Sequence, residues 1–202
     1  MFDLVALVKT AGYLGLFGII FAESGLLIGF FLPGDSLLFT AGFLASQGYL
    51  NVWVLTILTF CAAILGDNFG YAIGKKLGPK VFKKEDSFLF NRDHLERARV
   101  FYEHHGGKTI MLARFLPVIR TFVPILAGVG DMKYKNFIFF NILGAVIWAI
   151  GMTWLGYFLG NTIPNADQYI VPIVIAIIIL SSIPTITHFL VHLIRNKKNE
   201  QN

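Results

Sequence analysis

The chain has 202 residues and a formal net charge of +5, with 55% hydrophobic but only 14% charged residues. Its mean hydropathy is +0.66, whereas a soluble domain carries about 25% charged residues. These values exclude an ordinary soluble domain and a disordered chain. The single cysteine excludes an intramolecular disulfide framework and a cysteine-based zinc site. We therefore expect an all-α integral membrane protein that forms a single transmembrane domain over residues 1–202.

The first apolar stretch covers Gly12–Ser46 and is interrupted at Pro33 and Gly34. Proline breaks a helix, and non-helical backbone at membrane depth is tolerated only where protein or a water-filled cavity satisfies it. We interpret this stretch as a re-entrant hairpin with its break at these two residues. A crossing by residues 1–22 is the alternative, so the side of the N-terminus stays open.

A predicted span at Val52–Ile73 runs into a basic loop at residues 75–108, which holds nine basic and five acidic side chains. An excess of Lys and Arg marks the cytoplasmic side of a membrane protein. The loop ends with an expected amphipathic helix near Asp93–His105, lying on the inner membrane surface. No nucleic-acid recognition motif accompanies the basic residues, so we expect contact with anionic lipids and no nucleic-acid partner.

The second apolar stretch, Thr109–Gly130, is predicted to be another re-entrant hairpin, broken at Pro117 and Pro124. Two spans follow, at Asn136–Gly160 and Tyr169–Ile194, and each is long enough to cross a bilayer. They run out and back, which places the C-terminus in the cytoplasm. The aromatic residues of the first of these spans are assigned to an interfacial belt: Trp148, Trp154 and Tyr157.

The two halves of the chain read alike. Repeat A covers about residues 12–74 and repeat B about residues 109–160, followed by the extra span at 169–194. The matching positions are Phe31-Leu32-Pro33 with Phe115-Leu116-Pro117, Ala41-Gly42 with Ala127-Gly128, Tyr49 and Asn51 with Tyr134 and Asn136, and Tyr71 and Gly74 with Tyr157 and Gly160. The first span ends inside and the second outside. The fold expected is therefore an inverted repeat of a re-entrant hairpin plus a transmembrane helix, a pattern typical of transporters.

Five charged residues lie within apolar sequence: Glu23, Asp35, Asp67, Arg114 and Arg120. A charge at the bilayer centre costs about 3 kcal/mol on insertion scales, so such residues are functional candidates by default. Glu23, Asp35 and Asp67 are candidates for proton coupling or for ion pairs with the arginines. The structural alternative is a buried ion-pair network that only holds the hairpins together. For Asp67, near the inner end of its span, a position in interfacial water is a further alternative.

Arg114 and Arg120 flank Pro117, and Thr121 follows directly. A guanidinium group presents a planar fork that suits phosphate or carboxylate, and a helix that restarts after a break exposes free backbone N–H groups. We therefore predict that Arg114, Arg120 and Thr121 form an anion site, for a phosphate or carboxylate group, with a purely structural ion pair as the alternative.

Enzyme signals are weak. His104 and His105 are adjacent and cannot share one helix face as metal ligands at i and i+4 do. Ser24, Ser36 and Ser46 lack a nucleophile elbow. We expect no enzymatic activity, no metal site and no cofactor.

Several of these stretches resemble motifs of the DedA family of membrane proteins. They are Phe31–Phe39 with Ala41-Gly42, Gly66-Asp67, Tyr102–Thr109, and Ala113–Thr121, which is the most specific. The resemblance covers about Gly12 to Ile194. It implies two opposed re-entrant hairpins and the movement of lipids between leaflets, either undecaprenyl phosphate or phospholipids, with some members dependent on the proton-motive force. It also implies that Glu23, Asp35, Arg114 and Arg120 are functional residues.

The leading hypothesis is a flippase of the bacterial cytoplasmic membrane that moves a phosphate-bearing lipid, with protons as a coupling partner. Undecaprenyl phosphate is the favoured lipid, and a phospholipid is the alternative substrate. A proton-coupled exchanger of a small ion or cationic drug is the second hypothesis, and a non-transporting membrane-organising protein is the third. The substrate, the transport direction, the coupling ion and the oligomeric state, including a homo-oligomer, stay open.

Overall fold

The computed structural model describes residues 4–27, 29, 32–81 and 106–162, and every regular element within these ranges is a helix. The predicted all-α fold is therefore confirmed for this part of the chain. The helices are α1 (Leu4–Gly25), α2 (Gly34–Ser46), α3 (Val52–Val81), α5 (Lys108–Ala113), α6 (Pro117–Val129), α7 (Tyr134–Ala145), the π-helix η2 (Val146–Ile150) and α8 (Gly151–Thr162). α7, η2 and α8 form one continuous rod.

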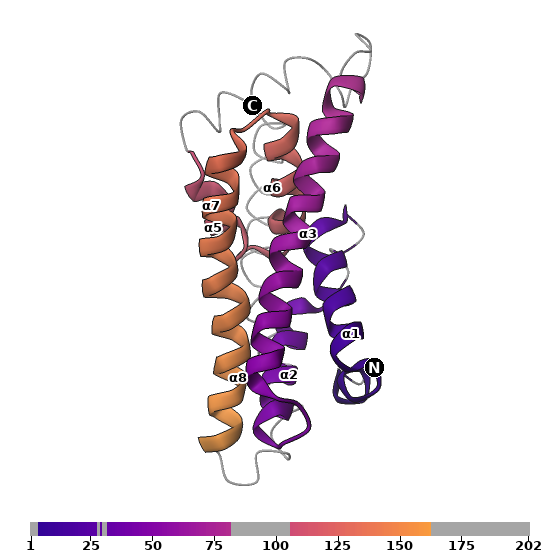
Figure 1. The fold of residues 1–202 in the computed structure, drawn as a ribbon, viewed down its shortest axis with the longest axis vertical. Helices are drawn as coiled ribbons and strands as arrows, with labels where there is room; N and C mark the ends of the chain where they lie inside the picture. Colours follow the sequence, from indigo (N-terminus) through magenta and orange to yellow (C-terminus); the bar gives the residue numbers. More distant parts are fainter. Residues whose placement is uncertain (1–3, 28, 30–31, 82–105, 163–202) are drawn as a thin grey trace, which may run out of the picture.

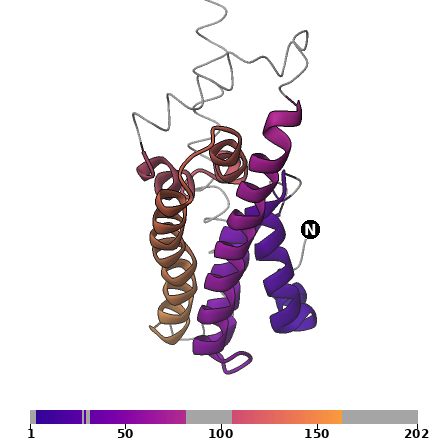
Figure 2. The same cartoon turned by 45° about the horizontal axis from the view of Figure 1, so that its top comes forward.

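The long helices are arranged side by side. α3 lies between α1 and the α7–η2–α8 rod, and the two views in Figures 1 and 2 agree on this order. In Figure 1, α6 lies near one end of the long axis and α2 near the other. The two short helices approach each other at their N-terminal ends, where Arg120 in the first turn of α6 bonds to Asp35 at the start of α2.

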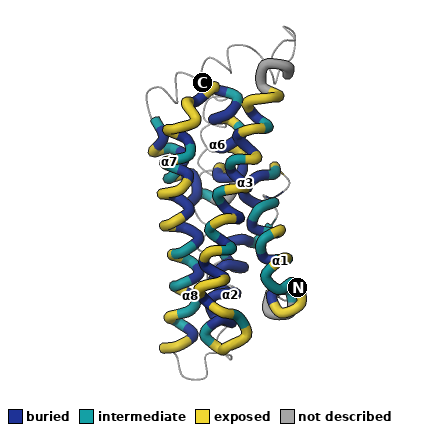
Figure 3. Tube along the Cα trace, in the orientation of Figure 1, coloured by how far each residue is buried: buried dark blue, intermediate teal, exposed yellow. Residues whose placement is uncertain are grey.

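Three of the described helices are long and apolar enough to cross a membrane: Leu7–Gly25, Val52–Leu77 and Tyr134–Thr162. The second begins at the start of the predicted span but its helix continues to Val81. Large apolar side chains such as Trp53 remain exposed, and exposed positions recur along α3 and the α7–η2–α8 rod (Figure 3). An apolar exposed surface is what lipid contact requires. The predicted C-terminal span Tyr169–Ile194 and amphipathic helix near Asp93–His105 lie outside the described residues.

Each of the two apolar stretches contains a break between helices. α1 ends at Gly25 and α2 begins at Gly34, with Pro33 at the N-cap position. α5 ends at Ala113 and α6 begins with Pro117, a position where the missing N–H does no harm. The helical chain is therefore interrupted at Pro33 and Pro117, as the sequence predicts.

The predicted break at Pro124 is wrong. Pro124 lies inside α6, which continues to Val129. A proline at this position leaves the carbonyl of Arg120 without its helical donor, but neighbouring groups and small local adjustments allow membrane helices to continue through proline. The second stretch therefore has a single break, at residues 114–116.

Glycines allow the short helices to pack closely against the long ones. α2 runs parallel to α8, and a Cβ atom at Gly42 would meet the backbone carbonyl of Thr153. On the other side of the molecule, α6 packs against α3, and a Cβ at Gly128 would meet the carbonyl of Tyr71. Small residues at such interfaces let backbones approach and gain van der Waals contact in membranes.

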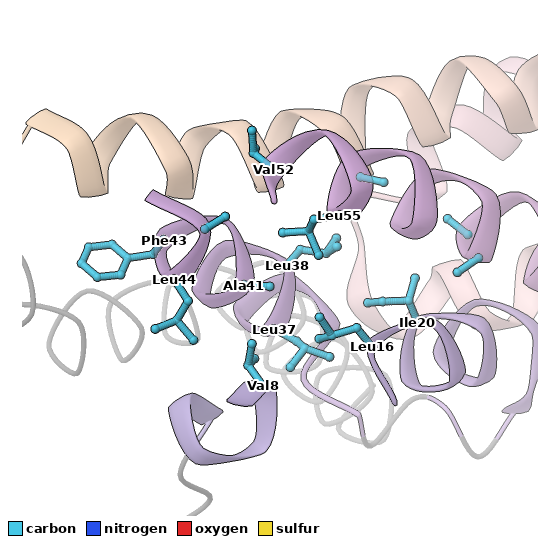
Figure 4. Packing of buried hydrophobic residues seen from close by; sticks show 14 of the residues in the cluster. Val8, Leu16, Ile20, Leu37, Leu38, Ala41, Phe43, Leu44, Val52 and Leu55 are labelled. Atoms are coloured by element: carbon cyan, nitrogen blue, oxygen red, sulfur yellow. The ribbon is translucent and has the colours of Figure 1, made fainter. Parts of the chain in front are cut away.

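The apolar interior consists of two clusters. One joins α1, α2, the first half of α3 and the middle of the α7–η2–α8 rod, and Figure 4 shows several of its residues, among them Val8, Leu16, Leu37 and Leu55. The other joins α5, α6, the second half of α3 and the start of α7. On α3, Asp67 lies between the two clusters. Asp67, one of the buried charged residues described next, therefore lies between two apolar cores.

Candidate functional site

Arg120 is the centre of the first group of buried charges. It lies in the first turn of α6, and its Nη1 donates to Oδ1 of Asp35, 2.7 Å away at the start of α2. Its Nη2 forms an ion pair with Oε1 of Glu23 near the end of α1. Nε1 of Trp148 donates to the same Asp35 oxygen at 2.6 Å. We call Glu23, Asp35, Arg120 and Trp148 the Arg120 cluster; its members come from four different helices.

Arg114 is the centre of the second group. It lies in the turn between α5 and α6, and its Nη2 donates to Oδ2 of Asp67 on α3 at 2.5 Å. The same nitrogen donates to Oδ1 of Asn141 on α7 at 2.5 Å. Nδ2 of Asn141 in turn donates to the carbonyl of Ile64 at 3.3 Å. We call Asp67, Arg114 and Asn141 the Arg114 cluster. It connects the break before α6 to α3 and to the α7–η2–α8 rod.

Trp148 lies between the two clusters. Cζ of Arg120 is 4.7 Å from the centre of its indole ring, and Cζ of Arg114 is 5.9 Å from it. A guanidinium within about 6 Å of an aromatic ring is attracted by the ring's electron density. Trp148 belongs to η2, and π-helical turns are frequent at functional sites. The two clusters therefore form one continuous polar layer.

The site is buried except at Asp35, whose side chain is 19% exposed, and it carries a negative formal charge. Glu23 is 1% exposed and Arg120 7% exposed. With all groups ionised, three carboxylates face two guanidinium groups, which gives −1 in total. Asp67 and Arg114 neutralise each other, so the excess negative charge lies in the Arg120 cluster.

Both arginines retain hydrogen-bonding capacity. Within the described part of the chain, Nε of Arg114 and Nε of Arg120 have no hydrogen-bond partner. Each guanidinium group therefore has a donor that its present carboxylate does not use. The same stretches offer no group of three or more His, Cys, Asp or Glu side chains that could hold a metal ion.

The structure divides the residues singled out from the sequence into these two clusters. Glu23 and Asp35 meet Arg120, and Asp67 meets Arg114. Asp67 is 3% exposed, so the alternative that placed it in interfacial water is wrong. Thr121 follows Arg120 on α6 and is fully buried. Arg114 and Arg120 flank Pro117 in the sequence. In the structure both guanidinium groups lie near the indole ring of Trp148, but they pair with different carboxylates.

Two residues of the site lie outside the set predicted from the sequence. Trp148 was assigned to an interfacial belt but is 3% exposed and bonded to Asp35. Asn141 was not singled out, although it is a fully buried partner of Arg114. They are seven residues apart, which is close to two helical turns and places them on one face of the rod. Both residues could have been predicted from the sequence, because their polar atoms recur on one face of an otherwise apolar span.

Comparisons with known proteins agree with this architecture. Residues 32–158 match the VTT domain. The chain is 44% identical to "Protein DedA" of Escherichia coli strain K12 over 94% of its own length and 87% of that protein. It is 45% identical to "Uncharacterized membrane protein ML0287" of Mycobacterium leprae over 83% and 75% of the two chains. It is 36% identical to "Inner membrane protein YqjA" of E. coli K12 over 74% and 68%. No solved structure matches the chain.

The VTT match covers α2 to nearly the end of α8 and includes Asp35, Asp67, Arg114 and Arg120, whereas Glu23 lies before it. The VTT match alone spans more than half of the chain, and two of the relatives named above are themselves described as membrane proteins. Together with three helices of membrane-spanning length and composition, they identify the kind of protein. The chain belongs to the DedA family of VTT-domain membrane proteins.

Proposed function

We propose that the two halves of the molecule are inverted repeats, each made of a re-entrant hairpin followed by a transmembrane helix. The packing of the helices supports this. The second helix of each hairpin packs on the long helix of the other half: α2 on α8, and α6 on α3. The glycines that allow this contact correspond across the repeat: Gly42 with Gly128, and Gly74 with Gly160. Two equivalent halves are expected to make such reciprocal contacts, in which a helix of each half packs on the other half.

We propose that the protein moves a phosphate-bearing lipid between the leaflets of the bacterial cytoplasmic membrane, with undecaprenyl phosphate as the favoured substrate. The observation that carries this proposal is a pair of buried guanidinium groups at the meeting point of two broken helices. Arg120 lies in the first turn of one broken helix and contacts the first residues of the other through Asp35. Helix N-termini and arginine forks are the two groups that proteins use most often to hold phosphate.

In this mechanism the headgroup crosses through the polar layer while the hydrocarbon tail remains in the bilayer. Arg120, together with Thr121 and Arg114, contacts the phosphate oxygens. Glu23 and Asp35 hold Arg120 when no substrate is bound, and they release it when they take up protons. The two hairpins give access to opposite leaflets because they enter from opposite sides. Proton uptake and phosphate binding are therefore linked through one guanidinium group.

The proposed orientation follows the charge of the loops. The basic stretch that begins near the end of α3 would lie in the cytoplasm, and the C-terminus on the same side. Lys75, near this end of α3, pairs with Asp131 after α6 at 3.3 Å, with both side chains more than half exposed. The α2–α3 connection, at the opposite end of α3, would then face outward.

Reconstituted protein tests the proposal. Transbilayer movement of a labelled short-chain polyprenyl phosphate is measured in proteoliposomes containing wild type, Arg120→Lys or Arg120→Ala. Lysine keeps the charge but lacks the planar fork, so both variants should move the lipid at least tenfold more slowly. Unchanged transport by both variants, in protein that unfolds at the wild-type temperature, would contradict the proposed phosphate contact.

One observation favours a second function, the exchange of protons for a small cation. The Arg120 cluster carries a formal charge of −1, which suits a cation better than an anion. In this case the carboxylates bind the cargo and the arginine only shapes the site. Proton flux followed with a trapped pH-sensitive dye separates the two functions. The exchanger predicts that Glu23→Gln abolishes flux while Arg120→Lys merely slows it, whereas the lipid transporter requires the arginine fork.

A further inference from the structure

The carboxylate of Glu23 sits on the N-terminus of α2. The backbone N–H of Gly34, the first residue of this 13-residue helix, donates to Oε1 of Glu23 at 3.1 Å. Pro33 at the N-cap position contributes no side-chain hydrogen bond. The end of α2 is therefore capped by a carboxylate from α1, eleven residues earlier in the chain.

The contact between Glu23 and α2 depends on a glycine. A Cβ atom at Gly34 would overlap with the carboxylate of Glu23. A side chain at this position would therefore push the carboxylate away from where it lies, so this contact in its present geometry depends on glycine. Glycine likewise lets phosphate groups approach the backbone closely in glycine-rich loops that precede a helix.

The other side of the same carboxylate faces Arg120. Its Oε1 forms the ion pair with Nη2 of that residue, so one backbone amide and one guanidinium group hold it together. These are the donors that bind a phosphate at other helix N-termini. Oε2 of Glu23 is buried and has no hydrogen-bond partner among the described residues. The carboxylate therefore occupies the site although only one of its two oxygens is hydrogen-bonded by the described residues.

We propose that the N-terminus of α2 and Arg120 together form the anion-binding site, and that the Glu23 side chain is its internal occupant, competing with the phosphate of the substrate. This inference rests on the proposed lipid transport and adds its regulation. A phosphate binds when Glu23 is protonated and withdraws. Glu23 thus acts as a built-in competitor that makes phosphate binding dependent on protons.

The charges around the site explain why the competitor must be neutralised. Among the described residues, the charged groups next to Glu23 are Asp35 from α2 and Arg120 from α6, with the Asp67–Arg114 pair of the neighbouring cluster beyond the indole ring. With Glu23 and Asp35 ionised, one guanidinium group already faces two negative charges. A phosphate added to this arrangement would meet net repulsion in a buried site, where charges are weakly screened. Protonation of Glu23 removes one of these charges and frees the donors that the phosphate needs.

Binding measurements on detergent-solubilised protein test this inference without any transport assay. Two soluble probes are titrated between pH 5 and pH 8: geranyl phosphate, and geranyl sulfate, whose charge is constant over this range. The proposal predicts that wild type binds geranyl sulfate more tightly as the pH falls, by up to about tenfold per pH unit for one linked proton. Glu23→Gln should bind at least about tenfold more tightly than wild type at pH 8 and show a flatter pH profile.

A charge-matched control is available in the exposed pair between Lys75 and Asp131. Asp131→Asn removes one negative charge far from α2 and should keep the wild-type pH profile. Glu23→Asp keeps the charge and should remain dependent on pH. If Glu23→Gln does not fold, the wild-type profile alone decides, because pH-independent binding of geranyl sulfate would overturn the proposal.

The outcomes separate this inference from the proposed function. Binding of both probes with no tightening in Glu23→Gln would refute the competitor and leave the phosphate site standing. Absence of binding to any folded variant at any pH would refute both. Inorganic phosphate in the same titration identifies the source of the anion. Weaker binding than geranyl phosphate would support a lipid headgroup, and equal binding would support a free anion held by the same donors.

Discussion

Besides the phosphate contact proposed for Arg114, the Arg114 cluster should stabilise the fold, and the size of this contribution can be worked out from its contacts. Arg114 and Asp67 side chains are 4% and 5% exposed, and Asn141 is fully buried. Replacing Arg114 by Met leaves the carboxylate of Asp67 buried without its cation. Breaking a buried pair in this way costs about 3–5 kcal/mol of folding free energy, because the remaining charge stays desolvated.

Removing both charges should restore most of that loss. Arg114→Met combined with Asp67→Leu replaces the pair by apolar groups, which is often neutral or even stabilising. The free energy of unfolding is measured for wild type, both single variants and the double variant in bicelles. We expect a coupling energy above about 2 kcal/mol from the double-mutant cycle. The exposed pair Lys75–Asp131 serves as control and should couple by less than about 1 kcal/mol. Single variants that unfold like wild type would refute the assignment of Arg114 and Asp67 as a buried pair.

Three further predictions concern packing and hydrogen bonding. Gly42→Ala should destabilise the protein by about 1–3 kcal/mol because the added methyl group would separate α2 from α8. The control Gly151→Ala, where a Cβ meets nothing within 4 Å, should be neutral or stabilising. Equal shifts of the unfolding temperature for both variants would contradict the close approach of α2 and α8. Trp148→Phe keeps the ring but removes the bond to Asp35, so unfolding free energy should fall by about 1.5–3 kcal/mol. Thr153→Val removes a buried hydroxyl that has no partner among the described residues, and should stabilise the protein by up to about 1 kcal/mol. The control Thr59→Val, which removes a hydroxyl bonded to the carbonyl of Leu55, should destabilise it by about 1 kcal/mol; the opposite order would disprove the distinction.

Hydropathy alone was sufficient to predict two of the three long helices described, whereas for α1 the sequence left a hairpin from Gly12 and a crossing by residues 1–22 both open. α3 begins at Val52, as predicted, and the α7–η2–α8 rod contains the predicted span Asn136–Gly160. The end of α3 at Val81 was missed because the helix continues past the apolar segment into basic sequence. Helical backbone hydrogen bonds are local, whereas the membrane boundary depends on polarity, so the two ends need not coincide.

The contents of the site were harder to predict than its location. The five charges in apolar sequence could be identified because each is costly at membrane depth. Which carboxylate meets which arginine could not, because Asp67 and Arg114 are brought together only by the packing of α3 against the turn before α6. Pro124 shows the same limit. A single proline indicates a possible helix break, but whether the helix continues depends on its packing, and α6 continues through Pro124.

The most direct test of the account is a comparison of two lipids in proteoliposomes. Transbilayer movement of a labelled short-chain polyprenyl phosphate and of labelled phosphatidylethanolamine is measured with wild type and with Arg120→Ala, after both proteins are shown to unfold at similar temperatures. The account predicts that wild type moves the polyprenyl phosphate and that Arg120→Ala loses this movement. Equal movement by the two proteins, or no movement of either lipid by folded wild type, would contradict a phosphate-reading lipid transporter.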